Sequence, residues 1–132
     1  MKELLRAAFS QFEKNQIQAV DAELLLAHLL GISRKQIHAQ NFDLADKDKE
    51  KIASEYADLI NQRLLGRPVQ YITGSAPFRY LDLEVGEGVL IPRPESELIV
   101  DRVIGYLNSA DDKDLAKSVI DLGAGSGALS IA

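Results

Sequence analysis

The sequence contains no cysteine and only two histidines, and these shortages exclude several kinds of site. Without cysteine the chain has neither a disulfide framework nor a thiolate zinc site, which favours a cytoplasmic protein. His28 and His38 have no carboxylate or second histidine at the spacing that metal ligands show. We therefore expect both histidines to serve in packing or at the surface, and we expect no metal site.

Long apolar runs and an excess of basic residues are also missing. No apolar run approaches the roughly 20 residues that a membrane-spanning helix needs. Residues 1–16 alternate charged and apolar residues at helical spacing, unlike a secretory signal. The 15 basic and 20 acidic residues give a formal net charge of -5, so the chain lacks the basic stripe of phosphate-binding proteins. We expect a soluble, unexported protein that binds neither membrane nor nucleic acid directly.

Several helices are predicted near the N-terminus. The run "VDAELLLAHLLG" offers Asp21 as an N-cap and Gly31 as the residue that ends the helix. Ser33 and Gln36 then form a capping-box pattern, which predicts a short helix after them. A further helix is predicted before these two, because apolar residues recur there at helical spacing. They form one expected buried face, made of Leu4, Leu5, Ala8, Phe9 and Phe12.

The longest predicted helix begins at about Asp46, where acidic residues suit the positive end of the helix dipole. Gly66 and Pro68 are expected to end it. One apolar stripe follows its length, made of Ile52, Tyr56, Leu59, Ile60 and Leu64. Residues 1–66 are therefore predicted to form a small helical bundle.

The pattern changes after Gly66. β-forming residues stand on both sides of the run "GSAP", with Val69, Tyr71 and Ile72 before it. After it, Leu81, Leu83 and Val85 alternate with acidic residues, as in a half-buried strand. This segment is predicted to be a β-hairpin, with one strand before "GSAP" and one after it.

The last third of the chain combines helix and strand patterns. The run "RPESELIVDRVIGYLN" predicts an amphipathic helix with Pro94 near its first turn. A polar loop, "SADDKDLAKS", separates it from a short apolar strand at 118–122, and a glycine-rich turn then leads into another helix. The expected buried face of the amphipathic helix consists of Leu98, Ile99, Val103, Ile104 and Leu107.

The glycine-rich turn suggests a nucleotide-like ligand. Gly123, Gly125 and Gly127 follow a predicted strand and open a helix, which is typical of the first βα turn of a doubly wound domain. Because Ala128 can stand for the last glycine of the dinucleotide fingerprint, the turn alone fits several cofactors or none. The Asp121 carboxylate favours the ammonium and sulfonium charges of S-adenosylmethionine over a pyrophosphate.

Three separated segments resemble one known family and follow its order. They are "DAELLLAHLLGISR", then "RPVQYITGSAPF" with "VLIPRPESELIV", and finally "DLGAGSG". Together they resemble the release-factor glutamine methyltransferases of the HemK/PrmC family over essentially the whole chain. The sequence departs from the family at Ser96, Tyr80, Leu83 and Ala124, where Thr, Gly, Phe and Thr respectively are common.

The resemblance implies a fold in three parts. Residues 1–66 would form a mainly α helical bundle that recognises the substrate, and residues 67–92 a β-hairpin linker. Residues 93–132 would begin an α/β Rossmann-like S-adenosylmethionine-dependent methyltransferase domain, with only its first β-α unit present. We expect that domain to be truncated here.

The resemblance also implies an activity and a set of site residues. The family transfers a methyl group from S-adenosyl-L-methionine to the glutamine of the Gly-Gly-Gln motif in peptide chain release factors, in translation termination. Arg93 and Glu97 either line the cofactor pocket or form an ion pair that fixes the hairpin against the following helix. The cofactor-binding residues that it implies are Asp121, Gly123, Ala124, Gly125, Ser126 and Gly127.

The family's Asn-Pro-Pro-Tyr motif, which holds the substrate glutamine, does not occur in these 132 residues. We therefore assign no catalytic residue to the chain and expect it to be inactive alone. Three alternatives stay open. They are a related enzyme that methylates a glutamine of a ribosomal protein, a non-enzymatic module that binds release factors, and a nicotinamide-dependent oxidoreductase.

Overall fold

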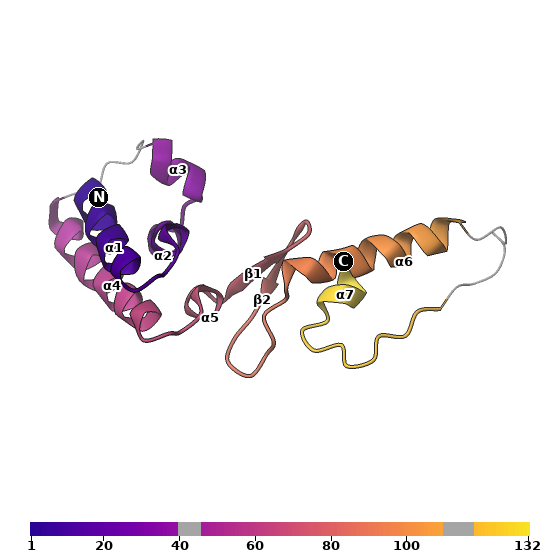
Figure 1. Cartoon of the computed structure of the whole chain (residues 1–132). Helices are drawn as coiled ribbons and strands as arrows, with labels where there is room; N and C mark the ends of the chain where they lie inside the picture. The colour runs from indigo at the N-terminus through magenta and orange to yellow at the C-terminus, as the bar shows by residue number, and fades with distance from the viewer. Residues whose placement is uncertain (40–45, 110–117) are drawn as a thin grey trace. The chain divides into compact units, whose positions relative to one another are not determined.

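The computed structural model describes residues 1–39, 46–109 and 118–132. The chain divides into two compact units, Met1–Thr73, here called the helical unit, and Gly74–Ala132, here called the hairpin unit (Figure 1). The elements, in order, are α1 (Lys2–Lys14), α2 (Ala19–Leu30), α3 (Arg34–Ala39), α4 (Asp46–Leu64), α5 (Val69–Thr73), β1 (Ser75–Phe78), β2 (Leu81–Glu84), the single 3₁₀ turn η1 (Pro94–Ser96), α6 (Glu97–Ser109) and α7 (Ala128–Ile131).

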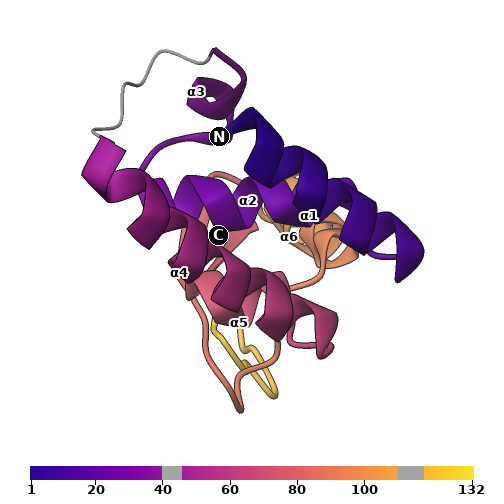
Figure 2. The same cartoon turned by 90° about the vertical axis from the view of Figure 1, so that its left-hand side faces the viewer.

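The core of the helical unit lies between α1, α2 and α4, and α2 packs against both of the other helices (Figure 2). Phe12 of α1 and the α2 residues Leu25 and Leu26 are completely buried. The predicted stripes of α1 and α4 face this core, with Tyr56 and Ile60 buried and their neighbours packed against them. The predicted buried faces are confirmed except at Ile52, which is half-buried outside this cluster. The prediction succeeds because each stripe follows the helical period.

Two predicted helix ends are confirmed in detail. Gly31 ends α2 in the left-handed conformation, with φ of 63°. The capping box before α3 is formed: the Gln36 side-chain oxygen accepts hydrogen bonds from the Ser33 amide and hydroxyl, each at 2.8 Å. A side-chain cap therefore sets the start of α3, and the backbone freedom of glycine sets the end of α2.

The prediction that Asp21 caps α2 is wrong. The N-cap is Gln18, and the helix begins at Ala19, so Asp21 lies inside the first turn. Its side chain is buried and its Oδ2 atom accepts a hydrogen bond from Arg63 Nε of α4 at 2.7 Å. A partner 42 residues away in sequence, rather than the helix end, determines where this carboxylate lies.

The predicted first strand of the hairpin is also wrong. Residues Val69–Thr73 form the short helix α5, where the amides of Tyr71 and Ile72 donate to the Pro68 carbonyl oxygen. Proline suits a helix start, and Val69 and Ile72 pack into the helical core. Burial on one side of a helix here outweighs the β propensity of these side chains.

The hairpin begins at Ser75, six residues after Val69, where its first strand was predicted to begin. Strand β1 contains Ser75, Ala76 and Pro77 of the run taken for the turn, and it pairs antiparallel with β2, with Phe78 opposite Leu81. Arg79 and Tyr80 therefore form a two-residue turn. The alternation in β2 is confirmed, because Leu83 is buried while Asp82 and Glu84 are exposed.

The helix predicted after the hairpin is confirmed, with Pro94 in the 3₁₀ turn that precedes α6. Its predicted buried face is wrong in part. Val100 is buried against Phe78, Leu83 and Ala128, whereas Leu98 and Ile99 are 67% and 52% exposed. Apolar residues surround most of α6, and within the described part of the chain only the Val100 side is fully covered.

The end of the chain departs from the predicted first β-α unit. Residues 118–122 form no strand, because the described residues provide no neighbouring strand with which they pair. Helix α7 after the glycines is confirmed, but a Rossmann-like unit is not. Most of the predicted polar loop, at 110–117, lies outside the described residues. None of the helices in the described ranges is long and apolar enough to span a membrane.

Candidate functional site

The glycine-rich turn has a backbone that requires glycine at three positions. The φ angles of Gly123, Gly125 and Gly127 are 79°, 58° and 74°, all in the left-handed region that other residues adopt only with strain. A Cβ on Gly125 would lie 3.7 Å from the Gly123 carbonyl oxygen, and no atom of the described residues lies within 4 Å of a Cβ at the other two positions. Backbone conformation, rather than crowding, therefore selects these glycines.

Asp121 is tied to the helix that follows the turn. Its Oδ2 atom accepts a hydrogen bond from the Ser130 hydroxyl at 2.6 Å. The turn itself is closed by a hydrogen bond of 2.8 Å from the Gly127 amide to the Ala124 carbonyl oxygen. The half-buried carboxylate and the glycine backbone are thus held on one short segment, which places a negative charge beside an open turn.

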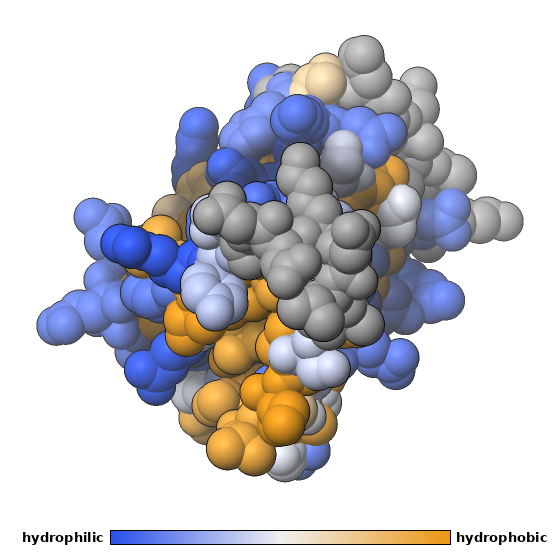
Figure 3. Space-filling model, turned by 90° about the vertical axis from the view of Figure 1, so that its right-hand side faces the viewer, coloured by the Kyte–Doolittle hydropathy of each residue, from blue (hydrophilic) through white to orange (hydrophobic). Residues whose placement is uncertain are grey.

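A groove of about 360 Å³ lies between α6 and the segment that carries the turn. Its lining is apolar except at Asp121 and Ser130, and it includes Ile99, Val103, Ile104, Leu107, Val119, Ile120 and Leu129. Figure 3 shows apolar side chains gathered on one face of the molecule, and in the hairpin unit Ile120 and Leu122 are 81% and 90% exposed. Such a lining suits apolar protein side chains better than a charged cofactor. The three glycines do not line it.

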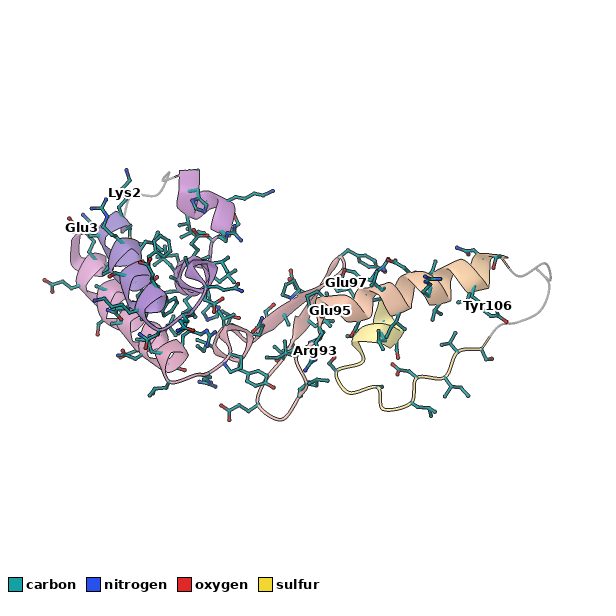
Figure 4. The ribbon with its side chains drawn as sticks, viewed as in Figure 1. Lys2, Glu3, Arg93, Glu95, Glu97 and Tyr106 are labelled. Carbon is teal, nitrogen blue, oxygen red and sulfur yellow. The ribbon has the colours of Figure 1, made fainter. Side chains whose placement is uncertain are left out.

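Arg93 and Glu97 lie at the start of α6 (Figure 4). Arg93 is exposed, and within the described part of the chain it forms no ion pair with Glu97. Glu97 instead accepts a hydrogen bond at 2.8 Å from the backbone amide of Arg79. Neither residue lines the groove, and the contact that the structure shows for Glu97 is the one with the hairpin turn.

Arg79 is a residue that sequence reasoning missed. It occupies the hairpin turn with φ of 54°, and its guanidinium donates a hydrogen bond to Asp101, which raises the pKa of the guanidinium. Its Nε atom is buried, and among the described residues it has no hydrogen-bond partner. The available signal was the pair Glu97 and Asp101, which are four residues apart and so share one face of α6.

The two histidines lie in the helical unit. His28 is exposed, and His38 Nε2 lies 3.3 Å from the Glu23 carboxylate, which Arg34 also contacts at 2.9 Å. Over residues 1–39, 46–109 and 118–132, no group of three or more His, Cys, Asp or Glu side chains is arranged to hold a metal ion.

Comparisons with known proteins concern both units. Residues 3–74 match the family model of the PrmC N-terminal domain. A release factor glutamine methyltransferase of Bifidobacterium longum is 35% identical over 131 residues, which cover 98% of this chain and 44% of that protein. The protein of the same name from Haemophilus influenzae is 36% identical over 135 residues, which cover 99% of this chain and 45% of that protein. The protein of the same name from Chlorobaculum tepidum is 37% identical over 135 residues, which cover 98% of this chain and 44% of that protein. The chain spans less than half the length of these curated relatives.

Proposed function

The chain belongs to the PrmC N-terminal domain family, and from this premise we propose that it is part of a protein glutamine methyltransferase that modifies peptide chain release factors with S-adenosylmethionine. The observation that carries the proposal is the similarity to proteins named release factor glutamine methyltransferase over 98% or more of this chain. That similarity includes the glycine turn as well as the helical unit. The proposed target is the glutamine of the Gly-Gly-Gln motif.

Each part of the chain then has a proposed role. The helical bundle, residues 1–66, recognises the protein substrate, and residues 67–92 link it to the catalytic domain. Residues 93–132 contribute the cofactor turn. The apolar groove beside α6 suits the apolar side chains of further elements of that domain, because exposed apolar surface of this kind marks a packing surface.

The turn fits S-adenosylmethionine in two respects. Open space at the Cβ position of Gly123 leaves the backbone of the turn accessible there, so amides other than that of Gly127, which already donates to Ala124, can bind the carboxylate of the donor. Asp121 supplies the opposite charge that the donor's ammonium or sulfonium requires, and only its Oδ2 atom is bound by Ser130. Ala124, Gly125 and Ser126 complete the proposed binding set. The donor supplies an electrophilic methyl group.

The reaction needs positioning more than acid or base catalysis. An amide nitrogen is a poor nucleophile because its lone pair is delocalised into the carbonyl group. Acceptors on both N–H bonds would orient that nitrogen towards the methyl group, and such orientation supplies a large part of a rate enhancement. The motif that would hold the amide is absent from these 132 residues.

Binding of the donor tests the assignment of the turn. Asp121→Asn should weaken the binding of S-adenosylmethionine to the 132-residue chain about tenfold, since a charge interaction worth about 1.4 kcal/mol is lost. Titration calorimetry measures the affinity of each variant for S-adenosylmethionine. Asp82→Asn is the matched control, because Asp82 is exposed on β2 and does not line the groove. Equal affinities of the two variants, or preferential binding of NAD, would contradict the assignment.

Methyl transfer tests the role of the missing motif. With labelled S-adenosylmethionine and a release factor, we expect the 132-residue chain to give no transfer above background, since it would act only as a binding module. Scintillation counting of the precipitated release factor measures the transfer. Turnover by this chain would show that the Asn-Pro-Pro-Tyr motif is not needed.

A further inference from the structure

The hairpin tip, Arg79 and Tyr80, contacts both helices of the hairpin unit, and the proposed function gives it no role. On the α6 side, the Arg79 amide donates to Glu97 Oε1 at 2.8 Å, and its guanidinium donates to Asp101. These contacts hold a non-glycine residue in the left-handed conformation, which costs free energy when nothing compensates it.

On the α7 side, the Tyr80 hydroxyl donates a hydrogen bond of 2.6 Å to the Ala132 carbonyl oxygen. The Arg79 guanidinium lies 5.9 Å from the centre of the Tyr80 ring, within the range of a cation–π interaction. The two tip residues therefore support each other, and between them they join α6 to the end of the α7 segment.

The apolar contacts beneath the tip join the same elements. Phe78, which precedes the tip, is 1% exposed and packs in one cluster with Val100 of α6 and Ala128 of α7. Helix α7 in turn begins at Ala128, directly after its N-cap Gly127 in the glycine turn, and holds Asp121 through Ser130. A continuous series of contacts thus leads from α6 through the hairpin tip and α7 to the turn.

We propose that the hairpin tip is a clasp that fixes α7, and with it the glycine turn, against α6. Arg79 and Tyr80 are then positioning residues for the turn, and they do not touch the ligand themselves. The identity of the ligand in this proposal rests on the proposed function. The claim that the tip fixes α7 against α6 rests on the contacts alone.

The hydroxyl of Tyr80 gives a clean test, because Tyr106 offers a matched control. Both tyrosines belong to the hairpin unit and are 73% and 74% exposed, and Tyr106 lies on α6 (Figure 4). In the 132-residue chain, Tyr80→Phe should lower the backbone order parameters of residues 128–131 from about 0.85 to below about 0.6, as measured by nitrogen-15 relaxation. Tyr106→Phe should leave them unchanged. Unchanged order parameters in Tyr80→Phe would overturn the clasp.

Titration with S-adenosylmethionine separates this proposal from the proposed function. Tyr80→Phe should weaken binding roughly fivefold, the effect of one lost hydrogen bond, and Tyr106→Phe should bind like the unaltered chain. If the unaltered chain binds no S-adenosylmethionine, the cofactor assignment fails while the order parameters still decide the clasp. If α7 loosens and affinity stays the same, the positioning role is overturned.

Discussion

Replacing Asp21 with alanine is expected to remove about 3 kcal/mol from the free energy of unfolding of the helical unit. Asp21 and Arg63 form an ion pair of 2.7 Å whose side chains are 11% and 23% exposed. Without the carboxylate, the guanidinium stays largely buried with no opposite charge. The expected loss lies near the lower end for buried pairs because Arg63 keeps some access to water. Urea unfolding followed by circular dichroism measures this change in the free energy of unfolding.

An exposed ion pair on α4, the helix that carries Arg63, supplies the control. Lys51 and Glu55 are 3.8 Å apart and 74% and 46% exposed. Glu55→Ala should therefore cost no more than about 0.5 kcal/mol. The double replacement Asp21→Leu with Arg63→Met should recover most of the stability, because it removes both buried charges. If Asp21→Ala and Glu55→Ala cost the same, the buried pair does not hold α2 to α4.

The features that could be predicted from the sequence depend on nearby residues. The apolar stripes of α1 and α4, the capping box at Ser33 and the glycine end of α2 each involve residues within about one helical turn of one another. These local signals do not depend on which other element the helix packs against. The turn predicted at the three glycines belongs to the same class, since the left-handed conformations that it needs are ones that glycine adopts readily.

The features that the sequence did not reveal depend on distant partners. Arg63 draws Asp21 into the core, and the helical core takes Val69 and Ile72 as a helix although both favour strands. Residues 118–122 have an apolar strand pattern, yet a strand needs a neighbour, and the described residues supply none. The bond from Ser130 to Asp121 and the clasp at Arg79 likewise join residues whose spacing has no local signal.

The second large effect concerns the substrate. If the helical unit recognises release factors, the 132-residue chain should bind a bacterial class I release factor without help from a catalytic domain. Replacing the glutamine of the Gly-Gly-Gln motif with alanine should leave this affinity unchanged, because the residues that would hold that glutamine are not in this chain. Binding that depends on that glutamine would instead place part of its pocket here.

Capture by the immobilised chain tests the central claim most directly. Purified release factor and purified ribosomal proteins would be offered together to the 132-residue chain, and the retained proteins identified by mass spectrometry. We expect the release factor to be retained and the ribosomal proteins to pass through. Retention of a ribosomal protein alone would contradict that claim and would identify the related ribosomal-protein methyltransferase instead.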